Sequence, residues 1–159
     1  MTSTADARPP SFVPPTATGP SPTAVLEVEV FGADLTAAAP WPAKVERLCA
    51  LAVASAGIED GHLAIEFVTA ERIAALNAEH RGKRGPTDVL SFPIDGAVPR
   101  DGGSGVPREL GDVVICPEHT ADLCEAIVHG TLHLVGMDHE TDEGEMLALQ
   151  AELLRWEAT

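Results

Sequence analysis

Short segments of the chain alternate between apolar and polar residues, and the segments between them repeat with a helical period. Residues 25–31 and 63–67 alternate strictly, which predicts two half-buried strands. Residues 89–92 and 113–116 are short apolar runs rich in β-branched side chains, and we predict a strand at each. Four strands of this kind are enough for one small sheet.

Four other segments carry apolar residues on one helical face. They are residues 41–56, a segment capped by Thr69 that carries Ile73 and Leu76, residues 117–135, and residues 143–156. In the last of them Met146, Leu149, Leu153 and Trp156 share a face, and Gly136 ends the third. Helices and strands interleave without a strict βαβ repeat. We therefore predict an α+β single domain, a mixed β-sheet packed with helices.

The distribution of proline and glycine separates a predicted tail from a predicted folded domain and marks one long loop within that domain. Residues 1–23 hold six of the 13 prolines and eight Ser or Thr, a composition that buries too little apolar surface to fold, so we predict a disordered tail. Residues 24–159 are then the folded domain. Within it, residues 94–109 contain four glycines and two prolines and are predicted to form a flexible loop.

Composition narrows the classes of function. The chain has 159 residues with 10 Lys and Arg against 25 Asp and Glu, a formal net charge of −15, which excludes binding of nucleic acid by bulk positive charge. No apolar run is long enough to span a membrane, and residues 1–23 lack the apolar segment of a signal peptide. The three cysteines show no CxxC pair and fit a reducing compartment. We expect a cytoplasmic protein.

The chemistry of the chain is concentrated at residues 129–139, where three of its six histidines lie. On a helix, His129 and His133 project from the same face one turn apart. Gly136 can then turn the chain so that His139 meets them, which is the histidine spacing of the metzincin motif HExxHxxGxxH. Three imidazoles predict an open site for one Zn²⁺ ion per chain, and zinc lowers the pKa of a bound water to about 7. We expect Asp138 to accept a ring N–H.

Gly130 separates this motif from that of the zinc proteases. Those enzymes carry Glu at this position as the general base, and a glycine has no proton acceptor. A zinc peptidase or amidase is therefore the disfavoured alternative.

A small basic cluster offers what a phosphodiester substrate would need. Arg81, Lys83 and Arg84 are three of the ten basic residues of an otherwise acidic chain. Arginine can bind phosphate oxygens in a bidentate manner and stabilise developing charge. A solvated basic loop is the simpler interpretation of this cluster, but its acidic surroundings favour a site that attracts a polyanion.

Three blocks resemble the YbeY family of bacterial endoribonucleases. They are His-Gly-Thr-Leu-His-Leu-Val-Gly-Met-Asp-His at 129–139, Leu76-Asn77 followed by Arg81-Gly82-Lys83 and the run Pro86 to Pro93, and Leu110 to Ile115. With the similar final helix, the resemblance extends over residues 25–157.

The resemblance implies a zincin-like fold with its metal site on a helix and the following turn. It implies a zinc-dependent endoribonuclease specific for single strands, acting in 16S rRNA 3′-end maturation and ribosome quality control, with the ribosome or small-subunit proteins as partners and no membrane. On the matching positions, the metal ligands would be His129, His133 and His139. Arg81 would be the catalytic residue and would bind substrate, and we add Lys83 and Arg84 as substrate-binding residues.

Two departures accompany the resemblance. Met137 stands where family members usually carry Tyr, and only twelve residues separate Cys116 from His129, a connector shorter than is usual in the family. We expect the short connector, residues 117–128, to remove part of the wall beside the site. The attacking group remains open between water and the ribose 2′-hydroxyl, and a ribosome-assembly factor with a structural zinc remains the non-enzymatic alternative.

Overall fold

The computed structural model describes residues 26–95 and 108–158. The tail predicted over residues 1–23 and most of the loop predicted over residues 94–109 lie outside this part of the chain.

The described residues form one mixed sheet of four strands. These are β1 (Leu26–Phe31), β2 (Gly61–Phe67), β3 (Val89–Pro93) and β4 (Glu109–Ile115), in the order β1-β2-β4-β3. The first three strands in this order run parallel, and β3 pairs antiparallel with β4 at the edge of the sheet. The predicted mixed sheet is therefore confirmed.

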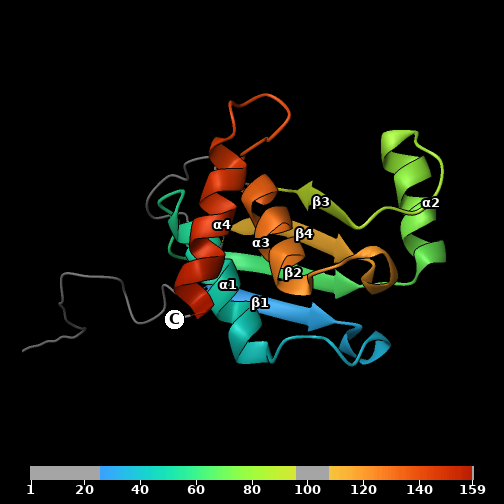
Figure 1. Cartoon of the computed structure of the whole chain (residues 1–159), viewed down its shortest axis with the longest axis horizontal. Coiled ribbons are helices and arrows are strands. Elements are labelled where there is room, and N and C mark those ends of the chain that lie inside the picture. Colours follow the sequence, from blue (N-terminus) through green and yellow to red (C-terminus); the bar gives the residue numbers. More distant parts are fainter. Residues whose placement is uncertain (1–25, 96–107, 159) are drawn as a thin grey trace, which may run out of the picture.

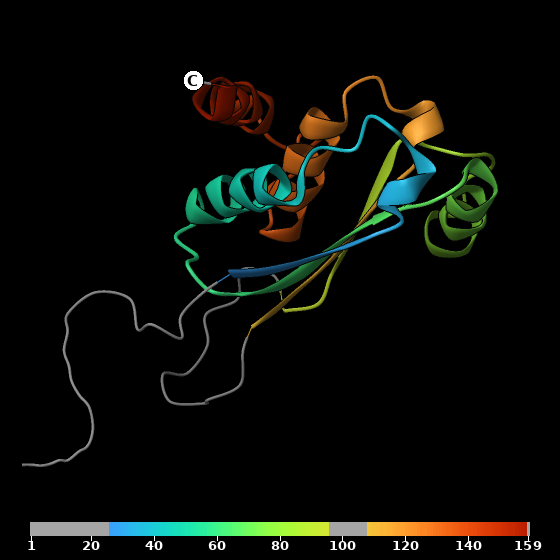
Figure 2. The same ribbon diagram turned by 90° about the horizontal axis from the view of Figure 1, so that it is seen from below.

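Helices cover both faces of the sheet unequally. They are α1 (Pro42–Ala54), α2 (Ala70–Arg81), α3 (Leu123–Leu134) and α4 (Glu145–Ala158), with short 3₁₀ helices at Ala33–Leu35 and Pro117–His119. In Figures 1 and 2, α1, α3 and α4 lie on one face, and α2 lies by itself on the other, near β3. Within the described residues, no helix combines the length and the apolar character needed to cross a membrane.

Two hydrophobic clusters follow from this arrangement. Val113 packs in the larger cluster with α1, α3 and α4, whereas its neighbour Val114 packs in the smaller one with α2, because successive residues of a strand point to opposite faces. Thr69 caps α2 as predicted, since its hydroxyl accepts the Arg72 backbone N–H at 3.2 Å. The sheet thus supports two helical layers of different size.

Two predicted boundaries are wrong. β4 begins at Glu109 rather than at residue 113, because residues 109–112 pair with β2 and β3 in the middle of the sheet despite their loop-like composition. The helix predicted over residues 117–135 begins only at Leu123, where the Asp122 carboxylate accepts the Glu125 backbone N–H at 3.1 Å and so caps α3.

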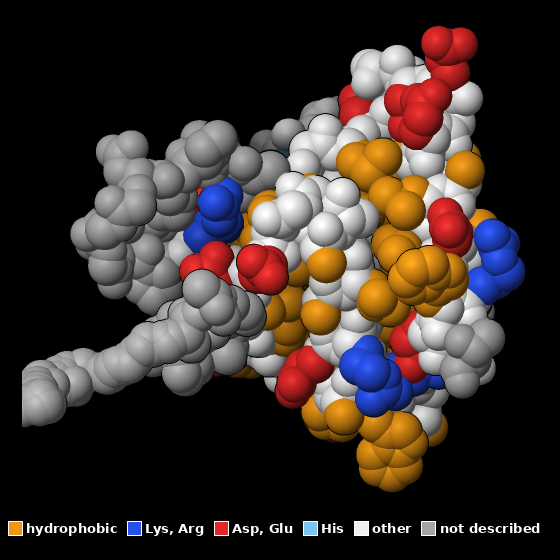
Figure 3. Space-filling view, turned by 90° about the vertical axis from the view of Figure 1, so that its left-hand side faces the viewer, with side chains coloured by type: hydrophobic (Ala, Val, Ile, Leu, Met, Phe, Trp, Pro, Cys, Tyr) orange, Lys and Arg blue, Asp and Glu red, His pale blue; other side chains and the backbone are white. Residues whose placement is uncertain are grey.

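The predicted apolar face of the last helix is only partly correct. Met146 and Leu153 are buried, but the Trp156 side chain is 63% exposed. Figure 3 shows hydrophobic side chains gathered in the middle of the face on which α4 and α1 lie. The first three turns of α4 therefore pack against the larger hydrophobic core, and Trp156 in the last turn does not.

Candidate metal centre

Helix α3 holds the first two histidines against the core. Its buried side is almost entirely apolar and includes Ile127 and Leu132, both fully buried in the larger cluster. The opposite stripe carries His129 and His133, whose ring centroids are 4.8 Å apart. Both side chains are half-buried, so they face a cleft rather than open solvent.

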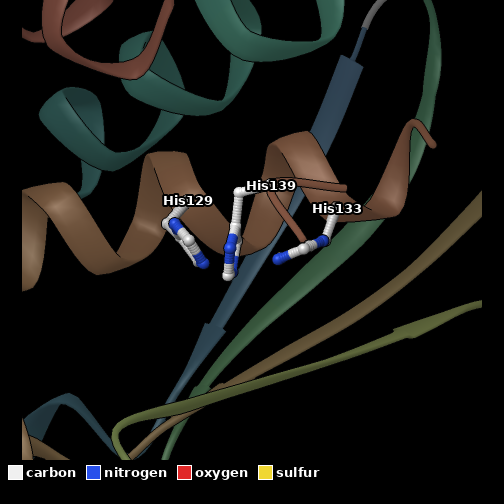
Figure 4. Close-up of side chains that lie close together, drawn as sticks. All are labelled: His129, His133 and His139. Atoms are coloured by element: carbon white, nitrogen blue, oxygen red, sulfur yellow. The ribbon is translucent and has the colours of Figure 1, made fainter. Parts of the chain in front are cut away.

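The turn after α3 brings the third histidine to the same point. Gly136 has φ +100°, a left-handed conformation that side chains rarely adopt, and it reverses the chain after the helix. The His139 ring then lies 5.0 Å from His129 and 5.2 Å from His133, measured between centroids. One ring nitrogen from each lies within 4.8 Å of those of the other two, and Figure 4 shows the three rings pointing toward one another. The predicted convergence is confirmed.

Two hydrogen bonds orient the rings. His129 Nδ1 lies 2.8 Å from Gln150 Oε1, and His133 Nδ1 lies 2.9 Å from the Met137 carbonyl oxygen. Because both partners are acceptors, each Nδ1 carries the proton and each Nε2 offers its lone pair to the cleft. Asp138 does not take the role expected of it. Its carboxylate accepts the Glu140 backbone N–H at 2.9 Å.

The electrostatics of the cluster favour a bound cation. Burial lowers the pKa of His133 below its ordinary value of 6.5, and the neighbouring His129 lowers it further. His133 is therefore neutral at pH 7 and can act as a ligand. Three converging imidazole nitrogens suit a divalent metal ion that prefers nitrogen, so the residues present fit the expected metal.

Gly130 marks the closest approach of α3 to the sheet. A Cβ at this position would collide with a Val113 methyl group of β4 and lie 3.2 Å from Ser91 Oγ. The Ser91 hydroxyl also donates to the Gly130 carbonyl oxygen at 2.9 Å. The glutamate of the zinc proteases therefore has no room here, so the packing of α3 on β4 excludes a general base at this position of the helix.

The histidines lie in a cleft of about 450 Å³ that α2, β3 and the turn after α3 enclose. Arg81, the last residue of α2, lines this cleft, as do Asp88, Ser91 and Glu140. Lys83 and Arg84 are exposed in the following turn and are not among the lining residues. The structure thus brings only Arg81 of the basic cluster to the histidines.

Comparison with known proteins identifies the relationship. The family model described as Endoribonuclease YbeY matches residues 34–156. The chain belongs to the YbeY family. An Endoribonuclease YbeY of Corynebacterium glutamicum is 41% identical over 113 residues, which cover 60% of this chain and 58% of that protein. The counterpart from Geobacillus kaustophilus is 38% identical over 128 residues, covering 69% and 82%.

The match to these YbeY proteins is partial in length. In four relatives from Corynebacterium and Bifidobacterium the chain spans between 56% and 59% of the relative's own length. A solution structure of the Thermotoga maritima protein TM1509 aligns with a TM-score of 0.48 and 24% identity, covering 82% of this chain and 88% of that one.

Two residues that support the YbeY site were missed or underrated in the sequence. Gln150 occupies a polar position within the buried stripe of α4, one turn after Met146, and that interruption was the available signal. Asn77 is buried, and its side-chain amide donates to the Gly85 carbonyl oxygen at 2.9 Å, while its backbone carbonyl oxygen accepts the Lys83 backbone N–H at 3.3 Å. It holds the turn that follows Arg81.

Proposed function

We propose that this chain is a zinc-dependent endoribonuclease that cleaves single-stranded RNA in the cytoplasm. One observation carries the proposal, namely that a cluster of three histidines and the Arg81 side chain line the same cleft. The relatives' name, Endoribonuclease YbeY, supports the reaction class. We extend it to maturation of the 16S rRNA 3′ end and ribosome quality control, with small-subunit proteins as partners.

The roles of the ligands follow from their contacts. His129, His133 and His139 would hold one Zn²⁺ ion through the ring nitrogens that face the cleft. Zinc supplies Lewis acidity toward phosphate oxygens when it is bound. Gln150 and the Met137 carbonyl fix the two rings on α3, so that the ligands need little reorganisation.

Arg81 would bind and orient the scissile phosphate. Its guanidinium can donate two hydrogen bonds to phosphate oxygens and offset the charge that develops on them. Lys83 and Arg84, exposed beside it, would contribute to capture of the polyanion by longer-range attraction. We expect their effect to fall with salt, whereas that of Arg81 persists.

The test uses the zinc-loaded chain and a single-stranded RNA with the 16S 3′-end sequence. Arg81→Ala should lower kcat/KM about 100- to 1000-fold. Arg72→Ala, an exposed arginine on the same helix that does not line the cleft, is the matched control and should retain activity. A double change of Lys83 and Arg84 to Ala should raise KM at low salt only.

Other outcomes would redirect the assignment. Casein cleavage that depends on His133 would indicate a peptidase. Absence of RNA cleavage, together with normal cellular function of Arg81→Ala, would favour an assembly factor with a structural zinc. End-group analysis identifies the nucleophile, since a 2′,3′-cyclic phosphate product shows that the ribose 2′-hydroxyl attacks first.

A further inference from the structure

A second cleft, of about 350 Å³, continues from the metal cleft toward the N-terminus of α3. The two clefts share Asp88, Val89 and His129. Glu125, His129 and His133 follow one another at intervals of four residues, so they lie along one stripe of the helix. The clefts are thus two halves of one groove that runs along α3.

The second cleft has walls of its own. On one side lies the short connector before α3, including Ala121 and Asp122, and on the other lie Leu147 and Gln150 of α4. Val89 of β3 and Leu147 of α4 contribute apolar surface to the lining. A flat, partly apolar group of moderate size matches this space.

Charge separates the two halves of the groove. Arg81 lines the metal cleft together with Asp88 and Glu140, whereas the second cleft, which shares Asp88, is lined in addition by Asp122 and Glu125 and by no Lys or Arg of the described residues. A phosphate group is repelled from such a lining. A neutral group that donates hydrogen bonds is attracted to it.

The second cleft also holds hydrogen-bonding groups that nothing in the described chain satisfies. Gln150 is only 8% exposed, and its Oε1 is occupied by His129, yet its amide NH₂ has no partner among the described residues. The Glu125 carboxylate likewise has none in that part of the chain. A ligand of this cleft would therefore meet one accessible amide donor, carried by a largely buried side chain, beside carboxylate acceptors.

We propose that this cleft is a nucleobase subsite for the nucleotide next to the scissile phosphate, selective for bases with an exocyclic amino group. The inference rests on the proposed function. The amino group of adenine, cytosine or guanine donates to a carboxylate such as that of Glu125, and a ring nitrogen or carbonyl oxygen accepts from Gln150. Uracil reverses this pattern, because in the same pose its O4 carbonyl faces the carboxylate and its N3–H faces the Gln150 NH₂, so that both hydrogen bonds are lost.

The test compares short single-stranded RNAs in which the nucleotide on either side of the cleaved bond is cytidine or uridine. Cytidine should be preferred about tenfold in kcat/KM at one of the two positions, the size expected for one charge-assisted hydrogen bond. Glu125→Gln should reduce that ratio to less than about twofold. The matched control Glu152→Gln, an exposed charge change on α4 outside the cleft, should keep it.

The outcomes separate this subsite from the function itself. Cleavage with no base preference, or with a preference that Glu125→Gln leaves intact, overturns the subsite and leaves the nuclease. If no RNA is cleaved, the proposed function fails. Equilibrium binding of the same RNAs then tests whether the second cleft still binds a nucleobase. A cytidine preference in binding that Glu125→Gln removes supports it, and equal binding of all RNAs overturns it.

Discussion

The two walls of the metal cleft are built differently. The α3 wall stands on the larger hydrophobic cluster, and its backbone touches β4 at Gly130. The α2 wall, which carries Arg81, rests on a cluster of six buried residues on the opposite face of the sheet. The ligand wall is therefore expected to be the more rigid, because local stability follows the amount of buried apolar contact.

This difference suits the two tasks. Metal ligands must keep their geometry whether or not substrate is present. Under the proposed function, an arginine at the end of a lightly packed helix can instead adjust to a flexible strand of RNA. The predictions below test whether the two walls can be disturbed separately.

The largest effect is expected at the ligand wall. His133→Ala removes one of the three proposed metal ligands and should weaken metal binding by more than about 100-fold, since loss of a group that only supports a ligand already costs about 10- to 100-fold. Metal content after dialysis measures this loss. His80→Ala on α2, which contacts Phe92 and lies outside the metal cluster, should retain the metal. Equal metal content in both variants would contradict the assignment.

Ile73→Ala should weaken the α2 wall by about 2–5 kcal/mol, because Ile73 is fully buried in the small cluster. Thiol labelling in a Cys124→Ser background can detect the change. Cys116 lies in the small cluster and should react faster, whereas Cys49 lies in the larger one and should not. Burial raises the pKa of Cys49 to about 12, so it reacts slowly until the core opens. Acceleration of both thiols would show that the walls are not independent.

Gly130→Ala should destabilise the chain by about 1–3 kcal/mol, because the added methyl group pushes α3 away from Val113. Denaturation by urea measures the loss. Val113→Ala combined with Gly130→Ala makes room for the methyl group, so the double variant should be more stable than the sum of the single effects predicts. Simple additivity would show that the strain lies elsewhere.

The smallest effect concerns His62, near the start of β2. Its Nδ1 lies 2.8 Å from Glu109 Oε1, and its Nε2 lies 2.6 Å from Glu29 Oε1. The hydrogen bonds to Glu109 and Glu29 raise the pKa of His62 above 6.5. The resulting stabilisation is complete below about pH 6.5 and is lost as the pH rises through the folded-state pKa. Because Glu29 and Glu109 are more exposed than the 24% exposed His62 side chain and solvent screens both pairs, we expect about 0.5 kcal/mol. We would measure the unfolding free energy of the zinc-loaded chain at pH 6 and at pH 9. The decrease between the two pH values should be about 0.5 kcal/mol larger for the wild type than for His62→Gln.

Much of the fold was predictable because local patterns and packing agree. The alternation in β1 and the apolar stripe of α1 both match the burial in the structure. Where they disagree, the prediction failed. Residue 109 was predicted to end a loop and residues 110–112 were assigned to no element, yet they form the start of a central strand, because pairing on both sides outweighs their composition.

The candidate site likewise has features that the sequence predicts and features that depend on tertiary packing. The histidines were predictable because their spacing on one helix and its turn fixes their positions, and the Gly136 turn is local as well. Gln150 was not, since its contact with His129 depends on how α4 crosses α3. Nor does the sequence show that Arg81 lines the cleft while Lys83 and Arg84 do not. That distinction depends on where α2 ends.

The contact between Gly130 and β4 also limits how this protein can evolve. Insertion of the protease-type general base needs only Gly130→Glu at the level of sequence, yet the new side chain would have to pass through Val113. A change of reaction class would require prior or simultaneous changes in the strand beneath the helix. The single substitution Gly130→Glu is thus closed as a path toward peptide hydrolysis, although the three proposed metal ligands already lie together.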